Sequence, residues 1–420
     1  MTHDSYTKQK TKPPDLMFSH FGINCHDPDK LEDFYTRVMG FCISDEGLIG
    51  GDTQRIIFMT RRPREHHQFV IAGGRDRSFE TTIGETGFKA PNLDALRHAH
   101  LVVSNEVNVA DINTIDHGIS WTLYFRDPEG NRISISVETN HYVPQPTIWP
   151  LDLSMSDEKI IKMNNERCKN NKSYMTKENW KIKKFNEFNE ENRLSEEGPV
   201  TGNPNPDFGV EKNLNNTLLK FKENLLPPPK VAQSHCAFKV SNMNNMVDFY
   251  DNVLGYAVTG KGKMMKIGTE PARNYTYLSR DPEEHHQLIL MSGRDMTAPT
   301  SVNQLSLRIS NLNELRRMEY ILDNNPYIGQ TRKTCHGNSF SIYFPDPEGN
   351  IVELAVESAW YVPAPHGTKM DLSWSDEQLI SWAENRCRNT PGFMMRSDWK
   401  TKARQELEAN GHIEIEGLVK

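Results

Sequence analysis

A long internal duplication is the sequence feature that most constrains the fold of this chain. Residues 65–69 (EHHQF) return at 284–288 as EHHQL, and residues 142–144 (YVP) return unchanged at 361–363. Both pairs are 219 residues apart in a chain of 420 residues. A solenoid unit has roughly 20–50 residues, so this repeat is far too long to be one. We therefore expect two related halves with the same order of elements.

Within each half the residue pattern predicts a strand, a helix and further strands, twice over. In the first half we expect strands at 18–25, 41–45, 55–60, 67–72, 86–90, 119–126 and 132–138, and helices at 28–39 and 93–102. The sequence Asp127-Pro128-Glu129-Gly130 has the chemistry of a tight hairpin turn. Residues 235–357 repeat this plan, which predicts an α+β chain of four βαβββ modules.

The duplication also sets the expected domain boundaries, with an N-terminal domain at 17–145 and a C-terminal domain at 232–365. The stretch 146–231 turns polar and ends in three prolines at 227–229, which is typical of a helical extension and a stiffened linker. Residues 366–420 are expected to form a second helical extension. Ser375, with Gln378 three residues later, predicts a capping box at the start of its first helix.

Charge and cysteine content narrow the classes of function. The net charge of −7 argues against a nucleic-acid binder, and six cysteines without a C-x-x-C pair argue against a disulfide scaffold or a zinc ribbon. No apolar run approaches the roughly 18 residues of a membrane span, and the first residues lack the apolar core of a signal peptide. We expect a soluble cytoplasmic protein with no nucleic-acid or membrane partner.

Several segments resemble the vicinal oxygen chelate superfamily, which contains glyoxalases, bleomycin resistance proteins and dioxygenases. They are HCAF at 235–238, FY at 249–250, LG at 254–255 and IYFPDPEGNIVEL at 342–354. The four modules and the repeated His-His pair look most like type I extradiol ring-cleavage dioxygenases. The resemblance covers about 17–145 and 232–365. It implies two tandem domains, each with two modules that form a cup-shaped mixed sheet.

The resemblance also implies a set of metal ligands in the C-terminal half. Carried over, the first ligand is His235, the second is Gln304 and the carboxylate is Glu353. Gln304 is a departure, because ring-cleaving dioxygenases have a histidine there to complete two histidines and one carboxylate. An amide oxygen is the weaker donor. Glu353 interrupts the apolar strand 351–356, where an unpaired carboxylate would be costly.

The corresponding places in the first half hold His20, Glu85 and Ser134. Ser134 stands where Glu353 stands in the second half, so the N-terminal domain lacks the terminal carboxylate. We therefore expect a metal-free N-terminal domain and an active site in the C-terminal domain.

Three further residues resemble the family's substrate-contacting groups. His286 matches the acid–base histidine, Tyr343 matches a tyrosine that binds substrate or intermediate, and His336 resembles a further histidine beside the substrate oxygen. His67 and Tyr124 repeat two of these residues in the first half. A purely structural role for the recurring pairs is therefore the alternative.

The resemblance implies an enzyme that cleaves a catechol-like aromatic diol with O2 at Fe2+, with Mn2+ or another divalent metal as alternatives. The partners would be a small aromatic substrate and O2, and association into a homo-oligomer is left open. A glyoxalase-type isomerase or lyase is the second expectation, since Gln304 fits such a site more easily. The third expectation is a protein without enzymatic activity that binds a flat hydrophobic ligand.

Overall fold

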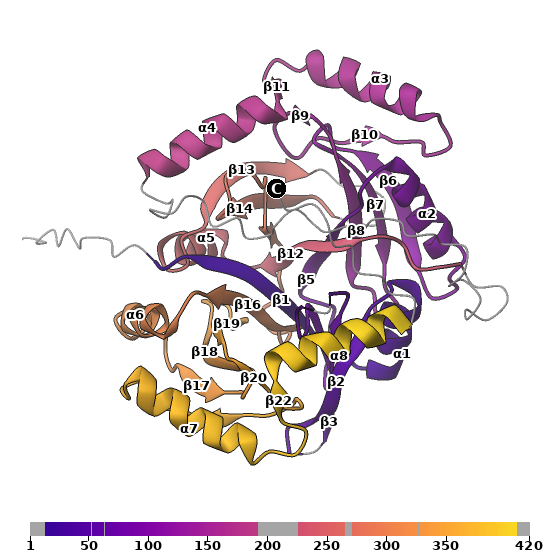
Figure 1. Cartoon of the computed structure of the whole chain (residues 1–420). Helices are drawn as coiled ribbons and strands as arrows, with labels where there is room; N and C mark the ends of the chain where they lie inside the picture. Colours follow the sequence, from indigo (N-terminus) through magenta and orange to yellow (C-terminus); the bar gives the residue numbers. More distant parts are fainter. Residues whose placement is uncertain are drawn as a thin grey trace, which may run out of the picture.

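The computed structural model describes residues 13–51, 53–62, 64–191, 226–264, 271–325 and 328–409 (Figure 1). Most of the expected linker and the end of the second extension lie outside these ranges. The helical segments are α1 (Pro28–Asp33), a π-helical turn (Phe34–Val38), α2 (Leu93–Ser104), α3 (Asp157–Lys169), α4 (Lys177–Glu190), α5 (Met243–Asn252), α6 (Leu312–Asp323), α7 (Asp376–Arg388) and α8 (Arg396–Ala409).

The strands follow the same order in the two halves. Those of the first half are β1 (Leu16–Asn24), β2 (Cys42–Ile49), β3 (Gln54–Thr60), β4 (Phe69–Ala72), β5 (Ile83–Lys89), β6 (Ala110–Asp116), β7 (Ser120–Arg126), β8 (Arg132–Glu138), β9 (His141–Tyr142), β10 (Trp149–Pro150) and β11 (Met175–Thr176). Those of the second half are β12 (Ala232–Val240), β13 (Ala257–Met264), β14 (Arg273–Ser279), β15 (Leu288–Ser292), β16 (Val302–Ile309), β17 (Arg332–Cys335), β18 (Ser339–Pro345), β19 (Ile351–Glu357), β20 (Trp360–Tyr361), β21 (Thr368–Lys369) and β22 (Met394–Met395).

Four modules form two curled sheets of nine strands each. We number them module 1 (β1–β4), module 2 (β5–β8), module 3 (β12–β15) and module 4 (β16–β19). One sheet has the order β2-β3-β4-β1-β16-β19-β18-β17-β21, and the other has the order β10-β6-β7-β8-β5-β12-β15-β14-β13. We call the first the 1–4 cup and the second the 2–3 cup. The expected α+β class, with paired modules in cup-shaped mixed sheets, is confirmed.

The pairing of the modules differs from the expectation that each half forms its own cup. Strand β1 runs antiparallel to β16, and β12 runs antiparallel to β5. Each half therefore gives one module to each cup. In Figure 1 the indigo β1 lies beside the orange β16, although the two are far apart in the sequence. The first strand of each half faces a module of the other half.

Local sequence chemistry explains the ends of the main elements. In both hairpin turns an aspartate, Asp127 or Asp346, accepts hydrogen bonds from two backbone N–H groups that follow it. The glycines at the end of these turns have φ values of 81° and 82°, which glycine adopts without strain. The capping box predicted at the start of α7 is confirmed, since Ser375 and Gln378 bond reciprocally.

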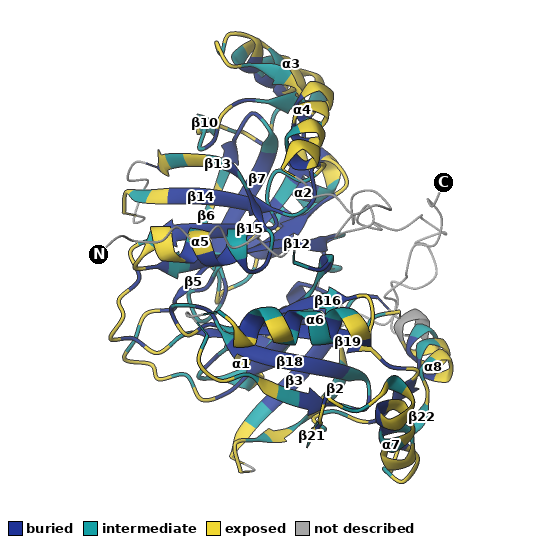
Figure 2. Ribbon diagram, turned by 90° about the vertical axis from the view of Figure 1, so that its left-hand side faces the viewer, coloured by how far each residue is buried: buried dark blue, intermediate teal, exposed yellow. Residues whose placement is uncertain are grey.

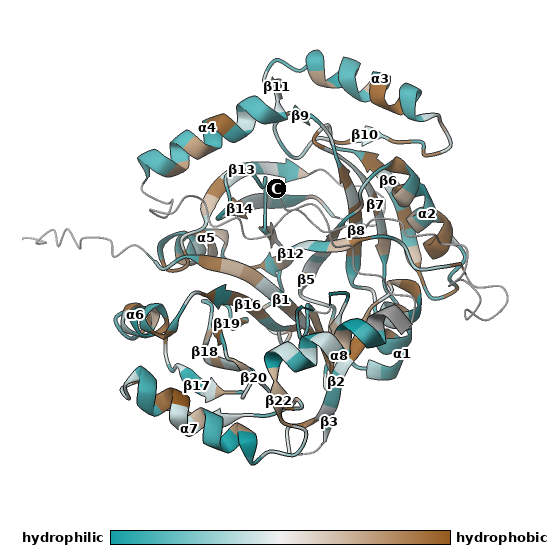
Figure 3. Ribbon diagram, viewed as in Figure 1, coloured by the Kyte–Doolittle hydropathy of each residue, from teal (hydrophilic) through white to brown (hydrophobic). Residues whose placement is uncertain are grey.

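One hydrophobic core joins the two sheets. It contains buried residues from all four modules, and Phe21 of β1 stacks on Phe238 of β12 with ring centroids 5.8 Å apart. The helices cover the sheets, with buried inner and exposed outer faces in Figure 2 and hydrophilic outer surfaces on α3, α4 and α7 in Figure 3. In the described ranges no helix has both the length and the apolar character that a bilayer span requires.

Candidate metal centre

The 1–4 cup encloses a cavity of about 1280 Å³. Three side chains from three strands meet in it, namely His20 of β1, Gln304 of β16 and Glu353 of β19. The register explains the meeting, because β16 lies between the other two strands and pairs with both. His20 and Glu353 are 5% and 3% exposed, so both would be costly to bury without partners.

The three side chains lie within bonding distance of one another. His20 Nε2 is 3.2 Å from Glu353 Oε2, and the Gln304 side-chain amide is 2.5 Å from His20 Nε2 and 3.3 Å from Glu353 Oε2. The amide presents its nitrogen here, and a half-turn puts the oxygen in the same place. Gly22 leaves room for this side chain, since a Cβ there would lie 3.3 Å from Gln304 Cγ.

This donor set fits one face of a divalent metal. Nitrogen and oxygen ligands lie about 2.0–2.2 Å from such an ion, so ligands at right angles are about 3 Å apart. The observed separations of 2.5–3.3 Å match that spacing. Among the described residues, no group of three or more His, Cys, Asp and Glu side chains could hold a metal. The site therefore depends on the amide as its third donor.

Part of the cavity wall is apolar. Ile56 and Phe58 of β3 line it, and Val70 and Ala72 of β4 pack in the same buried cluster behind them. Module 1 therefore contributes His20 from β1 and apolar side chains from β3 to the cavity. Three protein donors leave three of six coordination positions for other ligands.

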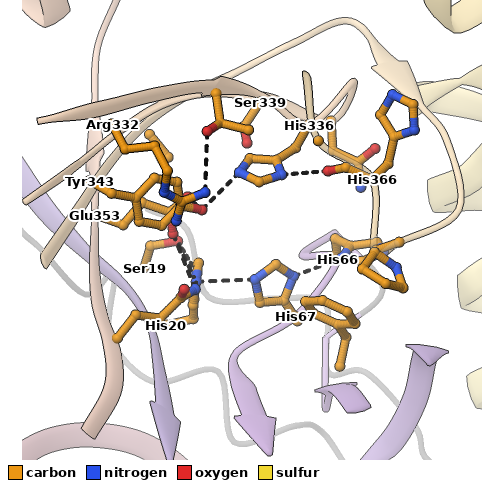
Figure 4. A pocket seen from close by; sticks show the side chains of 18 of the residues that line it. Ser19, His20, His66, His67, Arg332, His336, Ser339, Tyr343, Glu353 and His366 are labelled. Carbon is orange, nitrogen blue, oxygen red and sulfur yellow. Dashed lines mark hydrogen bonds and ion pairs between the residues drawn. The ribbon is translucent and has the colours of Figure 1, made fainter. Parts of the chain in front are cut away.

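Two groups flank the carboxylate. The Tyr343 hydroxyl donates to Glu353 Oε1 at 2.5 Å and lies 2.8 Å from His336 Nε2 (Figure 4). Burial alone would raise the pKa of Glu353, but the hydrogen bonds from His20 and Tyr343 outweigh it and hold that pKa well below its usual range. Burial raises the pKa of Tyr343 and lowers that of His336, so both are neutral at pH 7.

A further histidine, His67, faces His20 from the other side. Its Nε2 lies 3.1 Å from His20 Nε2, and Figure 4 shows the two rings pointing toward one another. Burial lowers the pKa of His67 well below its ordinary value, so the ring is neutral and one of its nitrogens carries no proton. His67 is thus positioned beside the three candidate donors.

The structure corrects the expected ligand set. It brings Gln304 and Glu353 together with Tyr343 and His336, as the resemblance implied, but not with His235. His235 lies in the 2–3 cup, where its Nε2 is 3.1 Å from Glu85 Oε1, and His286 lies next to it with ring centroids 4.4 Å apart. The physical reason is the pairing of β12 with β5, which turns His235 toward module 2.

His20 and His67 take the places expected for His235 and His286. Both were visible in the sequence as the repeat partners of those two histidines. Sequence reasoning assigned them to the N-terminal half because nothing in the repeat says which modules share a sheet.

In the 2–3 cup, His235 and His286 line a small cavity of about 60 Å³. Glu85 faces His235 and, at 3.6 Å, the guanidinium of Arg132, which lies over the Tyr124 ring at 4.1 Å. Burial would raise the pKa of Glu85, but the hydrogen bond from His235 and the charge of Arg132 lower it to about 2. A fixed cation thus already balances this carboxylate.

Comparison with known proteins supports the resemblance to the superfamily that the sequence indicated. Residues 17–135 match the family model described as Glyoxalase/Bleomycin resistance protein/Dioxygenase superfamily. The chain is also 24% identical over 126 residues to biphenyl-2,3-diol 1,2-dioxygenase 3 of Rhodococcus globerulus. This aligned stretch covers 29% of this chain and 62% of the length of that relative. This is the superfamily named above as the vicinal oxygen chelate superfamily, so the expected resemblance is confirmed.

Two solved structures are also similar. Glyoxalase I from Zea mays is 12% identical and aligns over 81% of this chain and 92% of its own, with a TM-score of 0.43. The 2,3-dioxygenase LapB from Pseudomonas sp. KL28 is 15% identical over 84% of this chain and 96% of its own, with a TM-score of 0.27.

Proposed function

We propose that this protein is a metal-dependent enzyme whose substrate carries two neighbouring oxygens, and that it cleaves a catechol-like diol with O2. One observation carries the proposal. His20, Gln304 and Glu353 converge in a large cavity that the apolar side chains of Ile56 and Phe58 also line. Such a set leaves room at one ion for two diol oxygens and O2. The chemistry that Fe2+ supplies there is binding of the diol oxygens and electron transfer between diol and O2.

The chain's own residues supply binding, orientation and proton transfer. Ile56 and Phe58, which line the cavity, give an aromatic ring an apolar surface to pack on. His67 accepts a hydroxyl proton through its unprotonated nitrogen, because burial keeps the ring neutral. Tyr343 and His336 hydrogen-bond an oxygen of the substrate or product from the side of Glu353.

Gln304 favours a second candidate, an isomerase or lyase of the glyoxalase type. A neutral amide is a weaker donor than an imidazole and disfavours tight retention of iron. Proton transfer beside a metal-polarised carbonyl does not require O2. In that reaction His67 would move a substrate proton in the same cavity.

Oxygen uptake separates these functions. Protein loaded anaerobically with Fe2+ or Mn2+ is mixed with catechol or 2,3-dihydroxybiphenyl in an oxygen electrode. We expect one O2 consumed per ring-opened product, and none with Glu353→Ala. Metal binding without O2 uptake would contradict ring cleavage and favour the isomerase. If neither metal binding nor turnover occurs, both enzymatic proposals are wrong, and a ligand-binding role remains.

A further inference from the structure

The histidine beside the candidate donors is the end of a chain of hydrogen bonds. His67 Nδ1 lies 2.7 Å from His66 Nδ1, and His66 Nε2 lies 2.6 Å from Asp45 Oδ2. Figure 4 shows His66 and His67 linked in this way, with His67 pointing on toward His20. Asp45 of β2 is thus connected through the two adjacent histidines of the loop before β4 to the candidate metal centre.

The direction of each hydrogen bond in this chain follows from the carboxylate. An ionised aspartate only accepts hydrogen bonds, so His66 Nε2 carries a proton and donates a hydrogen bond to Asp45. A neutral His66 then has a bare Nδ1, which accepts a hydrogen bond from His67 Nδ1–H. The remaining nitrogen of a neutral His67, Nε2, carries no proton and faces the site. The chain therefore fixes His67 as an acceptor.

Asp45 is held in place by the second half of the chain. The Tyr361 hydroxyl donates to Asp45 Oδ1 at 2.9 Å, and the Ala364 N–H donates to Oδ2 at 2.9 Å. The Trp399 ring of α8 stacks on Tyr361 and lies 5.3 Å from the His66 ring. These donors keep the carboxylate turned toward His66.

The other cup contains the same histidine pair without the carboxylate. His285 Nδ1 lies 2.9 Å from His286 Nδ1, as in the 1–4 cup. Asp45 pairs with Phe58 on the neighbouring strand, and its counterpart Gly260 pairs with Tyr277. Among the described residues no hydrogen-bond partner reaches His285 Nε2, which lies 3.6 Å from where a Cβ of residue 260 would be. The complete chain occurs only in the cup with the candidate donors.

We infer that Asp45 and His66 are positioning residues that fix the tautomer of His67, so that Nε2 faces the candidate site as a proton acceptor. The catalytic part of this inference depends on the proposed function, whereas the tautomer does not. The logic is that of an aspartate that orients a histidine base in hydrolases. A merely structural contact would hold the ring in place but would not require a hydrogen-bond acceptor at residue 45.

Nitrogen-15 NMR of the metal-free full-length protein tests the tautomer directly. The His67 signals are assigned by their loss in His67→Gln. We expect the Nδ1–H form of His67 in the wild type, a mixture of tautomers in Asp45→Ala, and the wild-type form in Asp45→Asn, whose amide oxygen can still accept. A wild-type His67 with Nε2–H would overturn the inference, even if Asp45→Ala does not fold.

Turnover of 2,3-dihydroxybiphenyl by the metal-loaded protein tests the consequence. Asp45→Ala should lower kcat about 100-fold, the low end of the usual effect of an acid–base group, with KM within about threefold. Gly260→Asp is the matched control, because the new carboxylate reaches His285 and turnover should stay unchanged. Equal losses in both variants, or no loss in Asp45→Ala, would contradict the role. If the wild type turns over no diol, the proposed function fails, and the NMR result still decides the tautomer.

Discussion

The three candidate donors make different contributions at the scale of single residues. Glu353 brings the negative charge that a divalent metal requires, and His20 brings a strong neutral donor. Gln304 brings an oxygen of lower donor strength, and its amide lies within bonding distance of both. The affinity for iron should therefore be modest, and residue 304 is the position at which it can be raised.

Replacing Gln304 by His should tighten Fe2+ binding about tenfold or more, because an imidazole is the better donor and completes two histidines and one carboxylate. Anaerobic titration of Fe2+ into the metal-free protein measures this. Gln304→Ala is the control and should weaken binding. An unchanged affinity in Gln304→His would mean that residue 304 does not ligate the metal.

Glu85 of the 2–3 cup should act on stability and not on metal binding. Its folded-state pKa of about 2 lies below the ordinary value of 4.5, so its stabilising effect is complete above pH 4.5. The effect is lost as the pH falls from 4.5 toward 2. The difference in unfolding free energy between the wild type and Glu85→Gln should shrink over that window. A constant difference from pH 7 to pH 2 would contradict the assignment.

At the scale of elements, the sequence predicted most strands and helices but not which modules share a sheet. The predictions of the Asp-Pro-Glu-Gly turns and of the capping box of α7 were correct, because both features depend on a few neighbouring residues. β6 (Ala110–Asp116) was missed because its polar, half-exposed residues lack the pattern of a strand. The pairing of β1 with β16 was not predicted, because the repeat shows that the modules are alike but not which of them share a sheet. Gln304 and Glu353 were therefore found as candidate donors, but with the wrong histidine.

The last helices of the two halves offer a matched pair of substitutions. Trp399 of α8 stacks on Tyr361, and Trp180 of α4 stacks on Tyr142 and lies beside His285. Either Trp→Ala change should cost roughly 3–5 kcal/mol of stability, since both side chains are buried. Denaturant unfolding measures this cost. Only Trp399→Ala should also lower the turnover of 2,3-dihydroxybiphenyl, and equal turnover losses would contradict a special role for the 1–4 cup.

At the scale of the whole molecule, each half is incomplete without the other. The two cups share one core, and β1 and β12 each find a partner strand in the opposite half. The duplication therefore did not produce two independent units. One cup has a cavity of about 1280 Å³ with three converging donors, while in the other Arg132 lies beside the carboxylate of Glu85.

Separating the halves should expose this dependence. With a chain break placed between residues 192 and 225, the co-expressed halves should copurify in a 1:1 complex. Either half expressed alone should aggregate or self-associate, because the edges of β1 and β5 or of β12 and β16 lose their partners. Light scattering after size-exclusion chromatography measures the masses. Two stable monomeric halves would show that the cups do not need both halves.

Metal affinity in two matched variants tests the central claim, that the metal centre combines His20 with Gln304 and Glu353. Fe2+ is titrated anaerobically into the wild type, His20→Ala and His235→Ala, with circular dichroism as a check on folding. We predict about one ion per chain in the wild type and in His235→Ala, and a loss of binding of at least 10-fold in His20→Ala. Binding that survives in His20→Ala but is lost in His235→Ala would contradict the account.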